Sequence, residues 1–267
     1  MSQVDGSIVK SSENAAAVAG GWRDGILVLA IVLAPLGLAI VLFASGVFAL
    51  AGWQMVRGVA VELPSRANLQ PYGLLAYAVA SWIAVAAAWL WSSRRGMSRD
   101  VFLFRRLTWP ALIASALGFV VAIYGVPVLT HGLSQLTGGR GPEVRIDFHD
   151  PQSVAIYLLL FVVTTPLCEE ILYRGLLVAW LRRIGWGDRA ILLVGSLIFG
   201  ANHVIPLGLV WGAAMAVVLG AILFALRLRY ESLTPAWLAH FLFNAQPFLI
   251  HPLLTRLAPG LLPGHLS

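Results

Sequence analysis

The stretch A-I-L-L-V-G-S-L-I-F-G-A-N-H-V-I-P-L-G-L-V-W-G-A-A-M-A-V-V-L-G-A-I-L-F-A-L, residues 190–226, contains no Asp, Glu, Lys or Arg over 37 positions. A helix that crosses a bilayer needs about 20 mainly apolar residues, so this stretch is too long for one span. Its segment Asn202–Gly208 holds polar and helix-breaking residues. These predict a tight turn between two spans, about 187–204 and 207–226.

The whole chain shares this apolar character. Of its 267 residues, 59% are hydrophobic and 11% are charged, and the mean hydropathy is +0.84. A soluble domain is nearer half apolar and a quarter charged, so the composition indicates a polytopic protein embedded in a lipid bilayer. The net charge of +6 comes mainly from Arg in short segments between apolar runs. That pattern is typical of loop charge that sets membrane topology, and we expect no nucleic-acid partner.

Further apolar windows predict an all-α bundle of about seven or eight transmembrane helices. The predicted spans are 26–52, 72–92, 108–130, 153–183, 187–204, 207–226 and 233–250, with an eighth short or interfacial helix in 252–266. Residues 153–183 are long for one upright span, and we expect Pro166 to interrupt them. A polar tail, 1–24, precedes a single transmembrane domain, 25–267, whose first apolar run is too long for a cleaved signal peptide.

The loops predict an orientation in the membrane. Basic loops follow the second, fourth and sixth spans, whereas the loop between the third and fourth spans is acidic on balance. By the positive-inside rule, the basic loops and the N-terminus lie in the cytoplasm. The chain has one Lys against 17 Arg, with many Ala and Trp. This composition favours a GC-rich bacterial origin, and hence the bacterial inner membrane.

Three short patterns place ionisable or polar side chains within apolar spans. They are Glu169-Glu170-x-x-x-Arg174, Phe199-x-x-x-His203 and His240-x-x-x-Asn244. Residues four apart share a helix face, so Glu170 and Arg174 can pair, whereas Glu169 points about 100° away. An isolated charge at the bilayer centre costs roughly 2.5–3.5 kcal/mol on insertion scales. We therefore expect these groups to converge on one interior cavity.

Such a cavity holds the parts for amide hydrolysis. A carboxylate beside an imidazole can activate water as a general base, and His or Asn side chains can donate to a developing oxyanion. Glu169, His203 and His240 could instead ligate zinc and leave one position for water, although no H-E-x-x-H pattern occurs. Cys168, the single cysteine, is a weaker candidate nucleophile, because a thiol in an apolar span is usually inert packing.

The same segments, E-E-I-L-Y-R-G, F-G-A-N-H and H-F-L-F-N, resemble the three motifs of the CPBP family of intramembrane proteases. This family includes the type II CAAX prenyl endopeptidases and bacterial Abi proteins linked to bacteriocin self-immunity. The resemblance covers about 153–246, with the motifs in order and on separate spans. Tyr173 stands where the family often has Phe. The family is described both as metalloproteases and as glutamate-dependent proteases, so the resemblance leaves zinc as an open cofactor.

The resemblance also implies roles for individual residues. Glu169 would activate the water, His203 would assist it, His240 and Asn244 would form the oxyanion site, and Glu170 and Arg174 would support these groups. The implied substrate is a peptide or a membrane-anchored protein. Because prenylated CAAX proteins are eukaryotic substrates, we do not expect one for a bacterial protein.

Two other classes of function use the same residues. Intramembrane Glu and His can relay protons in a proton-coupled transporter, although the sequence shows no inverted repeat. A non-catalytic protein of the bacteriocin-immunity type would keep the cavity for packing or for binding a peptide.

Overall fold

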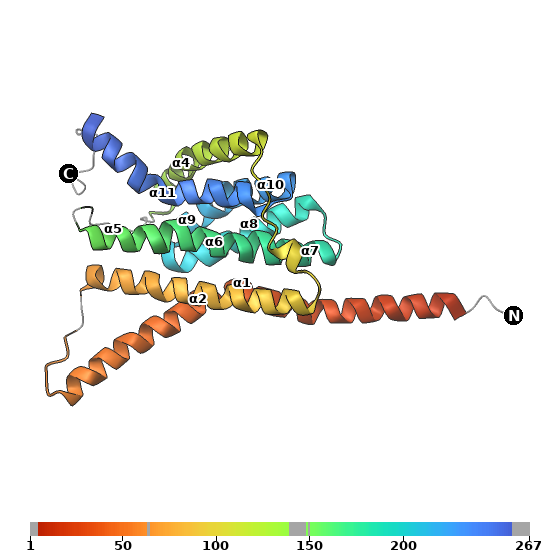
Figure 1. Cartoon of the computed structure of the whole chain (residues 1–267), viewed down its shortest axis with the longest axis horizontal. Coiled ribbons are helices and arrows are strands. Elements are labelled where there is room, and N and C mark those ends of the chain that lie inside the picture. The colour runs from red at the N-terminus through yellow and green to blue at the C-terminus, as the bar shows by residue number, and fades with distance from the viewer. Residues whose placement is uncertain (1–4, 63–64, 139–147, 149, 258–267) are drawn as a thin grey trace.

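The computed structural model describes residues 5–62, 65–138, 148 and 150–257, and its regular secondary structure in these ranges is helical (Figure 1). Six helices of this described part are long and apolar enough to cross a membrane. They are Gly21–Val56, Leu69–Arg94, Trp109–Thr137, Pro151–Arg183, Asp188–Leu207 and Leu209–Tyr230. They correspond to the first six predicted spans, so the prediction of an all-α, multi-pass membrane protein is confirmed.

Several spans combine α-helix with π-helical turns, in which the backbone bonds connect residues five apart. In chain order, the elements are α1 (Asp5–Val56), α2 (Arg66–Arg94), α3 (Ser98–Val101), α4 (Trp109–Thr137), α5 (Pro151–Tyr157), η1 (Leu158–Thr164), α6 (Thr165–Glu169), η2 (Glu170–Leu177), α7 (Val178–Arg183), α8 (Asp188–Leu207), α9 (Leu209–Ala214), η3 (Met215–Gly220), α10 (Ala221–Tyr230) and α11 (Leu233–Leu257). The run from α5 to α7 is unbroken, and we call it the central helix.

The predicted seventh span lies within α11. This helix is not among the six above, because His240, Asn244 and Gln246 lower its hydropathy. The predicted eighth helix falls partly on the last turns of α11, and its remainder, 258–266, lies outside the described residues.

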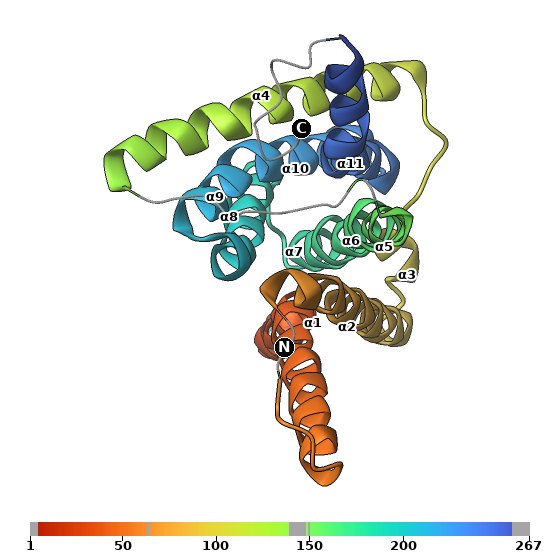
Figure 2. The same ribbon diagram turned by 90° about the vertical axis from the view of Figure 1, so that its left-hand side faces the viewer.

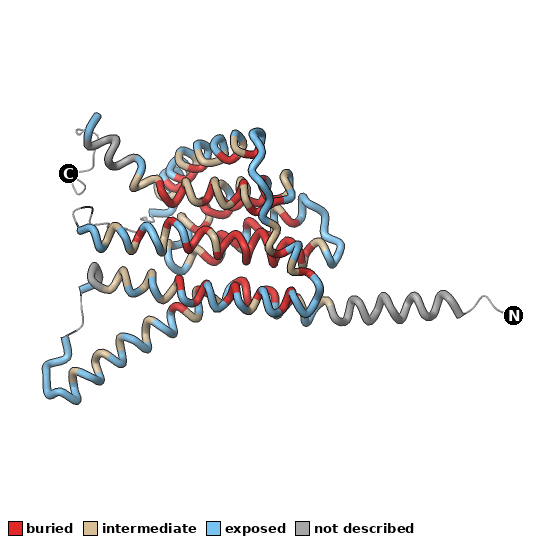
Figure 3. The backbone as a smooth tube through the Cα atoms, in the orientation of Figure 1, coloured by how far each residue is buried: buried red, intermediate tan, exposed pale blue. Residues whose placement is uncertain are grey.

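The central helix lies in the middle of the bundle. Figures 1 and 2 show it between a hairpin formed by α1 and α2 and the group from α8 to α11, with α4 on the outer side of that group. Buried residues gather along the central helix and its neighbours (Figure 3). In its most apolar window 50% of the residues are buried, against 17% in α4. Charged groups on the central helix are therefore shielded from lipid by protein.

The expected interruption of the central helix at Pro166 is wrong, because a π-helical turn accommodates this proline. The Thr165 N–H donates to the carbonyl of Leu160, five residues back, and the Thr165 hydroxyl donates to the same oxygen at 2.9 Å. Proline lacks an N–H and normally clashes with the preceding turn. The wider turn before Pro166 lets the helix continue, which keeps Glu169 and Glu170 near the middle of a span.

The predicted turn between the fifth and sixth spans is confirmed, but it lies at the end of the expected segment. Helix α8 continues through Pro206 to Leu207, and the chain reverses at Gly208. Gly208 has φ 85° and ψ 164°, a conformation that is essentially restricted to glycine. His203 therefore lies within a helix, one turn before this reversal.

Candidate active site

Glu170 and Arg174 form a fully buried ion pair on the central helix, as their spacing predicts. Arg174 Nη1 donates to Glu170 Oε1 at 3.1 Å, and neither side chain is exposed. The guanidinium carbon lies 4.3 Å from the ring centroid of Phe199 and 4.4 Å from that of Phe224. Two aromatic faces stabilise a desolvated cation. Since Phe199 belongs to α8 and Phe224 to α10, the ion pair packs against both helices.

His240, on α11, lies between the two neighbouring glutamates. Its Nδ1 is 2.9 Å from Glu170 Oε1, and since a carboxylate can only accept, Nδ1 carries the proton of this hydrogen bond. Its Nε2 is 3.8 Å from Glu169 Oε2, an oxygen that has no hydrogen-bond partner among the described residues. A separation of 3.8 Å is too long for a direct hydrogen bond, but one water can bridge it.

Glu169 has a partner that the sequence did not indicate. The Tyr77 hydroxyl, from α2, donates to Glu169 Oε1 at 2.8 Å. Tyr77 sits in the stretch L-A-Y-A-V-A, which offers no spacing or charge pattern that separates it from the other tyrosines. The contact arises because the central helix packs against a helix 92 residues away in sequence.

His203 makes no hydrogen bond to the glutamate cluster within the described residues. Its Nδ1 is 2.7 Å from the backbone oxygen of Phe199. This hydrogen bond puts the proton on Nδ1, so Nε2 of the neutral ring is an acceptor. The Phe199 ring centroid is 4.5 Å from that of His203 and 6.1 Å from that of His240. One aromatic ring thus packs against both imidazoles.

Asn244 donates a hydrogen bond to a backbone oxygen that the π-helical turn leaves without its usual helical donor. Its Nδ2 donates to the backbone oxygen of Phe161 at 2.9 Å. In an ordinary helix this oxygen would accept from the N–H of Thr165, but that N–H bonds to Leu160, and Pro166 has none to offer. Asn244 therefore satisfies a partly buried carbonyl of the central helix with one N–H, and its second N–H remains.

The three zinc ligands suggested by the sequence are not gathered into one metal-binding group in the part of the chain that the structure describes. Among the described residues, no group of three or more His, Cys, Asp and Glu side chains is arranged to hold a metal ion. Glu169 and His240 face each other, whereas His203 makes no hydrogen bond to either of them within the described residues. Binding of zinc stays a prediction.

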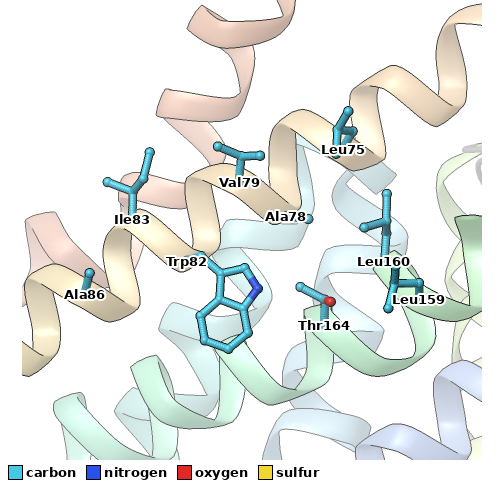
Figure 4. A pocket seen from close by; sticks show the side chains of 9 residues that line it. All are labelled: Leu75, Ala78, Val79, Trp82, Ile83, Ala86, Leu159, Leu160 and Thr164. Carbon is cyan, nitrogen blue, oxygen red and sulfur yellow. The ribbon is translucent and has the colours of Figure 1, made fainter.

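An apolar pocket of about 620 Å³ lies between α2 and the first half of the central helix (Figure 4). It is lined by Leu75, Ala78, Val79, Trp82, Ile83, Ala86, Leu159, Leu160 and Thr164. Figure 4 shows the Trp82 indole reaching from α2 toward the central helix. Ala78 follows Tyr77 in the chain, and Thr164 lies five residues before Glu169. The pocket therefore adjoins the helix segments that carry the Tyr77–Glu169 hydrogen bond.

A buried carboxylate that faces an imidazole inside a multi-pass helical bundle is an arrangement that suits an intramembrane protease. Residues 151–246 match the family model described as type II CAAX prenyl endopeptidase, Rce1-like. This segment, which carries all three motifs, is therefore similar to that family of proteases. Neither the curated proteins nor the solved structures gave a match. The family predicted from the three motifs is thus confirmed over the matched residues.

Proposed function

We propose that the protein is an intramembrane endopeptidase in which Glu169 activates water. The observation that carries this proposal is the pair of facing atoms, Glu169 Oε2 and His240 Nε2, 3.8 Å apart in a buried site. The other heteroatom of each group is already held, Oε1 by Tyr77 and Nδ1 by Glu170. Each group thus keeps one unbonded atom near the other, and we propose that a single water binds to both.

In the proposed reaction, the Glu169 carboxylate accepts a proton from the bound water as the water oxygen attacks the peptide carbonyl carbon. The carbonyl oxygen becomes an oxyanion, and preorganised donors stabilise it. The tetrahedral intermediate then expels the amine, which takes the proton from Glu169. Two products form, one with a new carboxylate and one with a new amine, and Cys168 takes no part.

His203 and Asn244 have supporting parts in this proposal. The Nε2 of His203 is an acceptor in the neutral ring, which suits a second contact to the water. The second N–H of Asn244 Nδ2 is left for the oxyanion after the first has bonded to Phe161. Glu170 and Arg174 fix the ring of His240 and balance charge within the cluster.

We propose that the substrate is a peptide or protein segment held in the membrane. The apolar pocket between α2 and the central helix supports this class, because its lining is almost wholly aliphatic and aromatic. Its α2 wall includes Leu75, Trp82 and Ile83, which are about half exposed on the outer surface of the bundle. An apolar segment could therefore enter from the lipid side without crossing water.

For orientation, we propose that the N-terminus faces the cytoplasm of a bacterial cell. Contacts between the basic loops support this arrangement. Arg183 Nη1 donates to the backbone oxygen of Arg95, and Arg182 Nη1 lies 3.6 Å from Glu231. Asp24 pairs with Arg95 at the same end of the bundle. A reporter enzyme that works only in the cytoplasm should be active when it is fused before Gly21. A reporter that works only in the periplasm should be inactive at this position, and its activity would contradict the orientation.

The central test replaces Glu169 by Gln in protein reconstituted in liposomes with a set of membrane-anchored peptides. We expect cleavage to fall by about 10²- to 10⁴-fold, because the amide keeps the shape and can accept from Tyr77 but cannot take a proton. Mass spectrometry of both fragments measures the rate. In water enriched in ¹⁸O, one heavy oxygen should enter the new carboxyl group in the wild-type protein.

The matched control is Glu62→Gln, the same exchange at an exposed loop position, which should cleave at the wild-type rate. Cys168→Ala should also remain active. Equal cleavage by Glu169→Gln and the wild type would show that the proposed function is wrong.

A further inference from the structure

We propose that Tyr77 is a positioning residue for Glu169, and this rests on the proposed function above. Tyr77 belongs to α2 and lies outside the matched segment 151–246. Its hydroxyl donates to Glu169 Oε1 at 2.8 Å. The catalytic geometry would then be completed by a helix that carries none of the three motifs.

The two neighbouring glutamates show why Glu169 needs this contact. Glu170 Oε1 accepts two hydrogen bonds, one from Arg174 and one from His240. Among the described residues, Tyr77 is the hydrogen-bond donor that Glu169 has. Both carboxylates are almost fully buried, with Glu169 3% and Glu170 0% exposed. Without the Tyr77 hydroxyl, no hydrogen bond within the described protein would fix the Glu169 carboxylate.

The contact also decides which oxygen of Glu169 reacts. Rotation about the last side-chain bond of glutamate is soft, so an unheld carboxylate samples many orientations. With Oε1 held on the α2 side, Oε2 faces His240 Nε2 across 3.8 Å. A displacement of about 1 Å in a reacting group can cost on the order of 100-fold in rate. Tyr77 thus acts on the reaction through Glu169.

The sequence of α2 explains how Tyr77 reaches the central helix. Ser81, Ala84 and Ala88 lie four, seven and eleven residues after Tyr77, so all four share one helix face. All three of these small side chains are buried, and small residues let membrane helices approach closely. The Ser81 hydroxyl bonds back to the Tyr77 carbonyl at 2.7 Å. The phenol at the end of this face can therefore bridge to α6.

Tyr173 shows that a tyrosine hydroxyl at this site is not always paired. Its side chain is 1% exposed, and its hydroxyl has no hydrogen-bond partner among the described residues. Tyr173 lies four residues after Glu169 on the central helix. Removing its hydroxyl deletes the same atom from a second tyrosine near the site without touching the Glu169 contact. Tyr173→Phe is therefore the matched control for Tyr77→Phe.

The experiment compares Tyr77→Phe and Tyr173→Phe with the peptide that the Glu169 experiment uses. We expect kcat of Tyr77→Phe to fall by about 10- to 100-fold with KM within about twofold, because the substrate contacts are intact and the base is misplaced. Tyr173→Phe should keep both constants. Tyr77→Phe loses a hydrogen bond to a buried carboxylate and should unfold at a lower temperature than Tyr173→Phe. Both variants should still unfold cooperatively above the assay temperature, which separates positioning from general loss of structure.

A spectroscopic arm tests the hydrogen bond without any substrate. The infrared difference between the protein and Glu169→Gln isolates the carboxylate bands of Glu169. These bands should shift in Tyr77→Phe and stay in place in Tyr173→Phe. Unshifted bands, or a kcat for Tyr77→Phe within about twofold of wild type, would overturn the role of Tyr77. If Glu169→Gln fails to cleave, that result would leave the proposed protease function standing.

If Tyr77→Phe does not fold, a second pair of variants tests the same hydrogen bond. Tyr77→p-aminophenylalanine keeps a donor at the ring position, whereas Tyr77→O-methyltyrosine removes the proton and keeps the oxygen. The amino variant should cleave at least about tenfold faster than the methoxy variant. Equal rates would overturn the proposal.

Discussion

The motif-bearing segment, residues 151–246, and the hairpin of α1 and α2 place their charged side chains differently. The segment buries Glu169, Glu170 and Arg174 in the middle of a span, each no more than 3% exposed. In the hairpin, Asp24 pairs with Arg95 at the end of the bundle, where the Arg95 side chain is 42% exposed. Both regions thus pair Arg with a carboxylate, but in very different surroundings.

The two regions contribute different kinds of side chain to the site. A charge inside a span must be matched within the protein, because lipid offers no compensation. The segment meets this need with an ion pair, two aromatic faces and an imidazole. From within the membrane the hairpin contributes an uncharged group, the Tyr77 hydroxyl, which can orient Glu169 at little electrostatic cost. Changes to matched residues in the two regions can test this division.

The largest effect is expected from Arg174→Met. The substitution leaves Glu170 buried with His240 as its remaining hydrogen-bond partner among the described residues. Breaking a buried ion pair by removing one partner typically costs about 3–5 kcal/mol. The free energy of unfolding, measured with denaturant in mixed micelles, should fall by that amount.

The double variant Glu170→Gln/Arg174→Met is the control for this prediction. It removes both charges, so it should unfold less readily than Arg174→Met alone. A loss below about 1 kcal/mol for the single variant would mean that the buried pair behaves like one at a surface.

Much of the fold could be predicted because apolar length and charge placement are local properties of the sequence. The approximate positions of the first six spans follow from apolar windows, and Gly208 ends α8 within the expected turn. The path of the chain at Pro166 could not be predicted. It depends on a π-helical turn in which Thr165 bonds to Leu160, and no residue pattern indicates that choice in advance.

The candidate site was predictable to the extent that its contacts lie one helical turn apart. The spacing of Glu170 and Arg174 predicts their pairing, and three polar motifs predict one buried cluster. Two contacts depend on how separate helices pack. Tyr77 reaches Glu169 across 92 positions, and Asn244 reaches Phe161 across 83. A single sequence carries no distance information of this kind.

An intermediate effect is expected from Asn244→Leu. Leucine fills a similar volume but cannot donate to the Phe161 oxygen, which then has no donor at the π-helical turn. Leaving this partly buried acceptor unsatisfied should cost about 1–2 kcal/mol. The free energy of unfolding should fall by this amount, and amide exchange in η1 should become faster.

The matched control is Asn202→Leu, at a buried position of α8, where we find no side-chain hydrogen bond within the described residues. Because this substitution removes no such hydrogen bond, it should lower the free energy of unfolding less than Asn244→Leu does. If Asn244→Leu lowers kcat but leaves the unfolding free energy unchanged, the amide acts on the substrate and contributes nothing to the central helix.

The smallest effect is expected from Arg95→Met, the hairpin counterpart of Arg174→Met. Arg95 pairs through both terminal nitrogens with Asp24, and its guanidinium carbon lies 5.7 Å from the Trp91 ring centroid. Because its side chain is 42% exposed, water can replace these contacts, and we expect a loss of about 0.2–1 kcal/mol. Salt should weaken the pair further, so the difference from wild type should shrink at high ionic strength. A loss as large as that of Arg174→Met, insensitive to salt, would mean that the end of the hairpin is shielded like the centre of the segment, and the contrast between the two regions would not hold.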